Sequence, residues 1–153
     1  MSGVTVTIES PYHDGVARLV KELDAYQTSL YPAESNHLLD IESLAHPTIH
    51  LFVARRNGEA LGCGALRIDP EGYGEVKRMF VLPASRGMKV GKQILQCIEE
   101  RAHCEGLPCL RLETGIHQSE ALGLYRSAGF VERSPFGGYR SDPLSVFMEK
   151  ALS

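Results

Sequence analysis

The stretch that most constrains the fold of this chain is residues 73–91, YGEVKRMFVLPASRGMKVG. Its first part is rich in strand-forming residues and ends at Pro83, and a short polar loop follows. From Val90 onward the apolar residues recur at the spacing of one helical face, and Gly106 ends this helix. The loop Ser85–Gly91 therefore brings its backbone N–H groups to a helix N-terminus. Such groups have no partner within the helix and attract anions, phosphate above all.

The same loop region carries three cations, Arg86, Lys89 and Lys92, and two glycines, Gly87 and Gly91. Glycine has no Cβ, so the backbone can approach a ligand closely at both positions. This combination favours a phosphate site, and the alternative is a plain strand-to-helix connection with solubilising lysines. The loop is not a nucleotide P-loop, because the chain contains no GxxxxGK[ST] and no GxGxxG after a strand.

The remaining segments predict a mixed sheet flanked by helices. Apolar and strand-forming residues predict strands at 4–8, 49–55, 61–68, 73–82, 109–113, 130–132 and 144–149. Helical spacing predicts helices at 13–30, 90–105 and 119–128, and 33–44 could form a further short helix. Asn57-Gly58 predicts a tight hairpin, and strand 109–113 should lie parallel to strand 73–82 because a helix joins them. We therefore expect an α/β (α+β) fold with a mixed, mostly antiparallel sheet.

The size and charge of the chain exclude several classes of protein. With 153 residues we expect a single domain, 1–153, with a proper core. A net charge of −3 argues against general nucleic-acid binding, because a duplex partner requires a basic face. No stretch approaches the roughly 18 apolar residues of a membrane span, and the start, MSGVTVTIES, is unlike a signal peptide. We expect a cytoplasmic protein with no nucleic-acid or membrane partner, and leave a homodimer open.

The four cysteines, Cys63, Cys97, Cys104 and Cys109, show neither CxxC nor another paired metal spacing. Cys97 and Cys104 fall on one face of the predicted helix, where core packing is the simplest account. His103 beside Cys104 would need two more ligands at a plausible spacing to bind zinc, and these are missing. We expect reduced, structural thiols and no metal site.

Three features of the chain resemble the GNAT superfamily, the acyl-CoA-dependent N-acetyltransferases. EVKRMFVLPASRGMKVGKQIL is similar to the family's acyl-CoA strand and pyrophosphate loop, [QR]xxGx[GA], which reads RGMKVG at 86–91. The helix and strand that follow agree with the family layout. QSEALGLYRSAGF at 118–130 is similar to NxxAxxLYxxxGF. Two positions depart from the pattern: Lys89 replaces a glycine, and Gln118 replaces the usual Asn.

The resemblance implies a fold with splayed central strands and acetyl-CoA as co-substrate. The pantetheine arm would pair with the exposed backbone of the central strand, which also offers an N–H to the oxyanion of the tetrahedral intermediate. The implied cofactor-binding residues are Met79, Phe80, Val81, Arg86, Gly87, Met88, Lys89, Val90, Gly91, Lys92 and Gln118.

Two residues are candidates for proton transfer. Glu75 precedes Met79 by four residues on one strand, so period-two alternation should place both on the same face, where Glu75 could act as a base. The alternative is that Glu75 pairs with a cation such as Lys77 or Arg67. Tyr125 resembles the family's acid that protonates the leaving thiolate, and a packed helix tyrosine is the alternative. No cysteine lies at a helix start or beside a cationic pair, so we expect direct transfer in a ternary complex.

The acceptor is expected to be a primary amine of a small molecule. The variable segments, 31–44 and 134–142, would build its site together with helix 13–30. Acidic residues in the first, Glu34, Asp40 and Glu42, could attract an amine, and Arg140 could hold a carboxylate. The alternatives are a protein lysine or N-terminus as acceptor, a non-catalytic acyl-CoA-binding module, and a non-enzymatic phosphate-binding domain.

Overall fold

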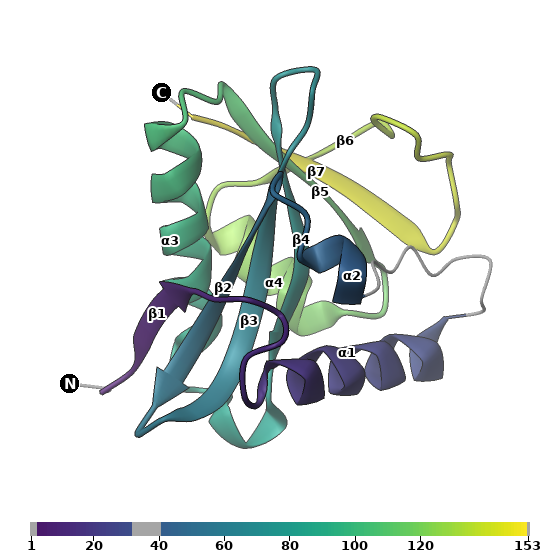
Figure 1. Ribbon diagram of the computed structural model, residues 1–153. Helices are drawn as coiled ribbons and strands as arrows, with labels where there is room; N and C mark the ends of the chain where they lie inside the picture. The colour runs from purple at the N-terminus through teal and green to yellow at the C-terminus, as the bar shows by residue number, and fades with distance from the viewer. Residues whose placement is uncertain (1–2, 32–40, 153) are drawn as a thin grey trace.

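The computed structural model describes residues 3–31 and 41–152 (Figure 1). The described strands are β1 (Thr5–Ile8), β2 (Ile49–Arg56), β3 (Glu59–Ile68), β4 (Gly74–Val81), β5 (Cys109–Gly115), β6 (Val131–Arg133) and β7 (Ser145–Ala151). The described α-helices are α1 (Val16–Leu30), α2 (Ile41–Leu44), α3 (Val90–Cys104) and α4 (Ser119–Ser127), and the short 3-10 helix η2 spans Pro83–Ser85.

One sheet contains the described strands in the order β1-β2-β3-β4-β5-β7-β6. Neighbouring strands are antiparallel except β4 and β5, which run parallel and are joined through α3. The expected mixed, mostly antiparallel sheet and the parallel position of β5 are thus confirmed. The hairpin between β2 and β3 also turns at Asn57 and Gly58, whose φ angles of 53° and 80° are the positive values that this tight turn requires.

Helices cover both faces of the sheet. On one face, Ile94 and Ile98 of α3 and Leu122 of α4 form a core with Leu66 and Leu112 of the sheet. On the other face, the apolar stripe of α1 packs against residues of β2, β3 and β4. The buried residues of that stripe are Val16, Leu19, Val20 and Leu23. Figure 1 shows α3 along one side of the sheet and α1 crossing the end of the central strands.

The central strands separate part of the way along their length. β4 pairs with β5 only from Gly74 to Val76, opposite Leu110 to Leu112. β5 continues to Gly115 in register with β7, whereas the part of β4 after Val76 has no partner on the β5 side among the described pairings. The second half of β4 therefore offers backbone N–H and C=O groups at the opening between the two strands.

A β-bulge in β4 changes which side chains share a face. Arg78 has a φ of 57°, and Arg78 and Met79 together lie opposite Gly64 of β3. Before the bulge, Glu75 is paired with Arg67 on the α1 face; after it, Met79 packs on the α3 face. The expectation that Glu75 and Met79 lie on the same face is therefore wrong, because the extra residue shifts the period-two alternation by one.

Two other expectations, the helix at 33–44 and the core packing of Cys104, have different outcomes. Only Ile41–Leu44 of the expected helix 33–44 lies in the described part of the chain, so Glu34 and Asp40 are outside it. Cys97 packs against the core, but Cys104 is exposed, so the expectation of core packing is wrong for Cys104. Cys104 ends α3, the chain turns, and Leu107 takes the core position there. The cysteines are free thiols.

Among residues 3–31 and 41–152, no helix is long and apolar enough to span a membrane. The same described residues contain no group of three or more His, Cys, Asp or Glu side chains that could hold a metal ion.

Candidate functional site

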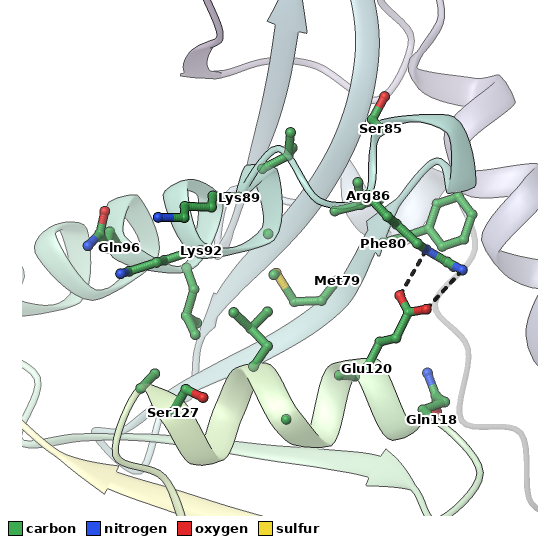
Figure 2. A pocket seen from close by; sticks show the side chains of 18 of the residues that line it. Met79, Phe80, Ser85, Arg86, Lys89, Lys92, Gln96, Gln118, Glu120 and Ser127 are labelled. Carbon is green, nitrogen blue, oxygen red and sulfur yellow. Dashed lines mark hydrogen bonds and ion pairs between the residues drawn. The ribbon is translucent and has the colours of Figure 1, made fainter. Parts of the chain in front are cut away.

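A cavity of about 740 Å³ lies between the end of β4, the start of α3 and the outer side of α4 (Figure 2). All of the cofactor-binding residues expected from the sequence line it except Met88, which packs against the core instead. Other lining residues were not expected from the sequence: Tyr26, Ser85, Leu95, Gln96, Glu99, Glu120, Ala121, Gly123, Leu124, Ser127, Ala128 and Lys150. Helical spacing from Lys92 and from Ala121 could have indicated several of these, because they follow on the same helix faces.

The N-terminus of α3 opens into this cavity without a side-chain cap. The first helical residues, Val90, Gly91 and Lys92, have backbone N–H groups that cannot find partners within the helix. Lys89, at the preceding position, has a φ of 60°, in the left-handed region that glycine adopts most easily. Lys89 therefore keeps the backbone turn expected of a glycine at this point and adds an ammonium group to an anion-binding helix end.

The cations of the cavity differ in their pairing. The guanidinium of Arg86 makes a two-point ion pair with Glu120 of α4, with Nε–Oε2 at 2.9 Å and Nη1–Oε1 at 3.3 Å (Figure 2). Lys150 pairs with Glu99. Lys89 and Lys92 have no ion pair within the described part of the chain and lie along the start of α3. These two lysines are therefore the cations most available to a phosphate.

Gln118 fixes the junction between β5 and α4. Its side chain is buried, and its Oε1 accepts a hydrogen bond from the backbone N–H of Gly115 at 3.0 Å. Gln118 also lines the cavity. Gln118, which is longer than the usual Asn, thus bonds the last residue of β5 and also lines the cavity.

Glu75 does not line this cavity but lies in a buried polar cluster on the α1 face. Tyr139 donates its hydroxyl to Glu75 Oε2 at 2.5 Å, and Lys77 Nζ donates to the same oxygen at 3.2 Å. Arg67 Nη1 reaches Glu75 Oε1 at 3.5 Å, and Lys77 also donates to Tyr139 at 2.7 Å. The ion pairs named above as the alternative for Glu75 are therefore present. Burial, together with the charge of Glu75, raises the pKa of Tyr139, so its phenol stays protonated.

Tyr125 is also absent from the cavity lining. Its ring is buried on the inner side of α4, at 5.7 Å between centroids from Phe130, within the core formed with α3. Burial raises the pKa of Tyr125 well above its usual value, with a further contribution from Glu113. The phenol is therefore in its neutral, proton-bearing form across the physiological range.

The segments expected to bind the acceptor are only partly placed near the opening. Tyr31, just after the end of α1, stacks on His117 with ring centroids 5.5 Å apart. The hydroxyl of Tyr31 accepts a hydrogen bond from the backbone N–H of His117 at 3.0 Å. A Cβ on Gly115 would collide with the Tyr31 ring, so glycine is required at this point. These contacts join the end of α1 to the end of β5. Glu42 and Arg140 are exposed.

The loop 134–143 is anchored by an aromatic cluster. Phe136 makes edge contacts with Tyr73 and Phe147, at 5.7 and 5.9 Å between centroids. Arg111 lies over the Tyr73 ring at 4.4 Å. This packing holds the loop against the sheet and sets Tyr139 over Glu75.

The separated parallel strands beside an uncapped helix N-terminus match the layout that the resemblance to acyl-CoA-dependent N-acetyltransferases implies, and comparisons with known proteins show the family. The model of the acetyltransferase (GNAT) family matches residues 16–130. The IAA acetyltransferase of Azospirillum brasilense is 56% identical over 153 residues, which cover 99% of this chain and 100% of that protein. The chain belongs to the GNAT family and is an acyl-CoA-dependent N-acetyltransferase with acetyl-CoA as co-substrate.

Two further similarities bear on the fold and the site. A crystal structure of a Klebsiella pneumoniae protein described as an acyl-CoA N-acyltransferase has a TM-score of 0.84 and 38% identity, and covers 100% of both chains. The aminoalkylphosphonate N-acetyltransferase of Salmonella typhimurium is 33% identical over 95 residues, 59% of this chain and 62% of that protein. The fold expected from the resemblance is confirmed.

Proposed function

We propose that the chain transfers the acetyl group of acetyl-CoA to a primary amine of a small molecule, by direct attack of the amine in a ternary complex. The observation that carries this proposal is the course of the cavity. It extends from the N-terminus of α3, past the unpaired part of β4, to Tyr26 of α1. One end offers N–H groups and lysines to phosphates, and the other lies beside the helix that packs on the opposite face of the sheet.

The pantetheine arm would pair with β4 at Met79, Phe80 and Val81 in the manner of an added strand. These residues line the cavity and have no strand partner on the β5 side among the described pairings. The pyrophosphate would accept N–H groups from the first turn of α3, with Lys89 and Lys92 as point charges. A backbone N–H from the same part of β4 would donate to the developing oxyanion.

The thiols support direct transfer over an acyl-enzyme. Burial raises the pKa of Cys63 to about 12, and burial also raises the pKa of Cys97 and Cys109. A thiol in this state is a poor nucleophile, because the thiolate is the reactive form. Cys104 is the last residue of α3, roughly 20 Å along the helix from its N-terminus at about 1.5 Å per residue, and it does not line the cavity. The amine itself is therefore the nucleophile that attacks the thioester carbon.

We propose different roles for the two candidate proton-transfer residues. The ring of Tyr125 does not line the cavity, but its phenol is protonated and its helix α4 does line the cavity; following the family resemblance, its proposed role is to donate a proton to the leaving thiolate of CoA. Glu75 accepts hydrogen bonds from Tyr139 and Lys77 and does not line the cavity. Its proposed role is to hold Lys77 and Tyr139 beside the opening of the sheet. A rate profile of Glu75→Gln that loses its acidic limb would instead restore Glu75 as the general base.

One relative supports a small acceptor that carries an amine and an acidic group. It is named for aminoalkylphosphonates, which have both groups, and the relative at 56% identity is named an IAA acetyltransferase. Arg140, which the sequence suggested as a partner for a carboxylate, is exposed. A protein lysine or N-terminus is the second acceptor class.

An acceptor screen tests the proposal. Release of CoA from acetyl-CoA would be followed with free amino acids, aminoalkylphosphonates, polyamines, aminoglycosides and lysine-containing peptides. We expect turnover with the small acceptors, and in Tyr125→Phe a fall in kcat of about 100-fold with the KM for acetyl-CoA little changed. Turnover with peptides alone would overturn the small-acceptor proposal. Full activity of Tyr125→Phe would leave that residue a packing role only.

A further inference from the structure

The guanidinium of Arg78 is buried with most of its donors unused. Its side chain is 3% exposed, and its Nη1 pairs with Asp24 of α1. Its Nε and Nη2 are buried and have no hydrogen-bond partner among residues 3–31 and 41–152. Asp24 is 40% exposed, so its carboxylate remains partly hydrated and balances the buried charge incompletely. Buried donors of a charged group without partners are costly, and native proteins rarely keep them without a reason.

The position of Arg78 suggests that reason. Arg78 forms the bulge of β4 with a left-handed φ of 57°, a conformation that a non-glycine residue adopts at a cost in free energy. It follows Val76, the last residue of β4 paired with β5, and precedes Met79, which lines the cavity. The bulge thus directs a charged side chain to the α1 face at the point where the strands separate.

Arg78 is not among the residues that line the cavity, but Met79 and Phe80, which follow it in β4, do line the end that an acceptor would use. Asp24, the partner of Arg78, lies two residues before Tyr26, which lines the cavity from α1 and packs near Phe80 with ring centroids 6.4 Å apart. A guanidinium offers a planar fork of N–H donors, which matches the oxygens of a carboxylate or a phosphonate. An anion bound there would leave an amine a few bonds away free to reach the end of the pantetheine.

We propose that Arg78 binds the acidic group of the acceptor and so selects amines that carry a carboxylate or a phosphonate. This inference rests on the proposed acetyl transfer to a small amine. The unpaired Nε and Nη2 donate to the acidic group, and Asp24 limits the binding by occupying Nη1. Substitution of Arg78 should therefore weaken binding of the acidic acceptor, whereas substitution of Asp24 should not. If the ion pair were purely structural, both substitutions would weaken binding equally.

The test compares acids with their matched neutral amides. Glycine, β-alanine and 2-aminoethylphosphonate would be used against glycinamide and β-alaninamide, with wild type, Arg78→Gln, Arg78→Lys and Asp24→Asn. In Arg78→Gln we expect the KM for the acids to rise by about tenfold or more, since a hydrogen bond to a charged group is lost, with the amides nearly unchanged. Asp24→Asn should leave the KM for the acids unchanged or lower it. The carboxylate and phosphonate arms show which acidic group is preferred.

Binding of acetyl-CoA, measured by calorimetry, verifies that each variant is folded, and Arg56→Ala is the matched control, because Arg56 is an exposed arginine that does not line the cavity. If Arg78→Gln does not fold, Arg78→Lys carries the test, because it keeps a charge but loses the fork. Equal use of acids and amides by the wild type, or equal losses in Arg78→Lys and Asp24→Asn, would overturn the inference while acetyl transfer stands. Binding of acetyl-CoA without turnover of any amine would instead count against the proposed function.

Discussion

Left-handed residues at two non-glycine positions shape both ends of the site. Arg78 sets the bulge that sends Glu75 and Met79 to opposite faces, and Lys89 turns the chain into the uncapped start of α3. Neither side chain favours this conformation by itself. Each is held by its surroundings, through β3 at the bulge and through α3 at the loop.

At the residue scale, we predict that Gly91→Asp weakens binding of acetyl-CoA by about tenfold or more, because it places a carboxylate beside the expected pyrophosphate. The fold should persist, since an acidic residue in the first turn favours the helix, and the tight 3.3 Å approach of a Cβ to Leu124 Cδ2 requires only a small shift at the end of that flexible side chain. Calorimetric titration with acetyl-CoA measures the effect.

Gly91→Ala is the control, because it adds the Cβ without the charge. We expect its dissociation constant to stay within about threefold of wild type, since the steric change is small. Equal affinities of the Asp and Ala variants would contradict the assignment of the pyrophosphate to this helix end.

At the scale of elements, α3 and α4 both line the cavity, and an ion pair connects the loop before α3 to α4. Arg86 belongs to the loop before α3 and Glu120 to the first turn of α4. Glu120 is 67% exposed, so the pair adds little to stability. The carboxylate of Glu120 occupies the Arg86 guanidinium, which a phosphate could otherwise bind. A phosphate that binds Arg86 must therefore displace Glu120.

We therefore predict that Glu120→Gln tightens binding of acetyl-CoA by about two- to fivefold, which corresponds to the roughly 1 kcal/mol limit for an exposed ion pair. The gain should shrink at high salt, where exposed charges are screened. Glu100→Gln is the control, because it changes the net charge equally at an exposed position of α3 outside the cavity lining. The same gain in both variants would show a general charge effect only.

At the scale of the whole molecule, the N-terminal strand and α1 are attached to the central sheet by a partly buried ion pair. Glu9 accepts two hydrogen bonds from Arg55 of β2, each at 2.8 Å. The hydrogen bond from Arg55 lowers the pKa of Glu9 below its value of 4.5 in the unfolded chain. The stabilisation is therefore complete above that unfolded pKa and is lost as the pH falls through the lower, folded pKa.

We predict that Glu9→Gln lowers the free energy of unfolding by about 1 kcal/mol at pH 7, and that the difference from wild type shrinks below the unfolded pKa. Urea unfolding followed by circular dichroism at pH 7 and at acidic pH measures this, and we expect one transition because we propose a single domain. Glu22→Gln removes an exposed pair with Arg18 and should change little. A difference that persists at acidic pH would contradict the role given to the ion pair.

The sequence alone determined the features that depend on a few neighbouring residues. The strand, loop and helix start of 73–91, the turn at Asn57-Gly58 and the parallel placement of β5 follow from local preferences and from the length of a connection. Helical spacing predicted α4, and the burial of Tyr125 in it corresponds to the packed helix tyrosine that was named only as the alternative. These are the parts whose physical causes lie within short windows of the chain.

Only the tertiary structure decided the features that depend on pairing between distant residues. The bulge at Arg78 arises from its register with β3, and it separates Glu75 from Met79, which alternation alone would have joined. The Arg86–Glu120 pair and the buried, unpaired nitrogens of Arg78 likewise depend on helices and strands far apart in sequence. Register and packing are set by the whole core, because one extra residue in a strand moves every later side chain to the other face.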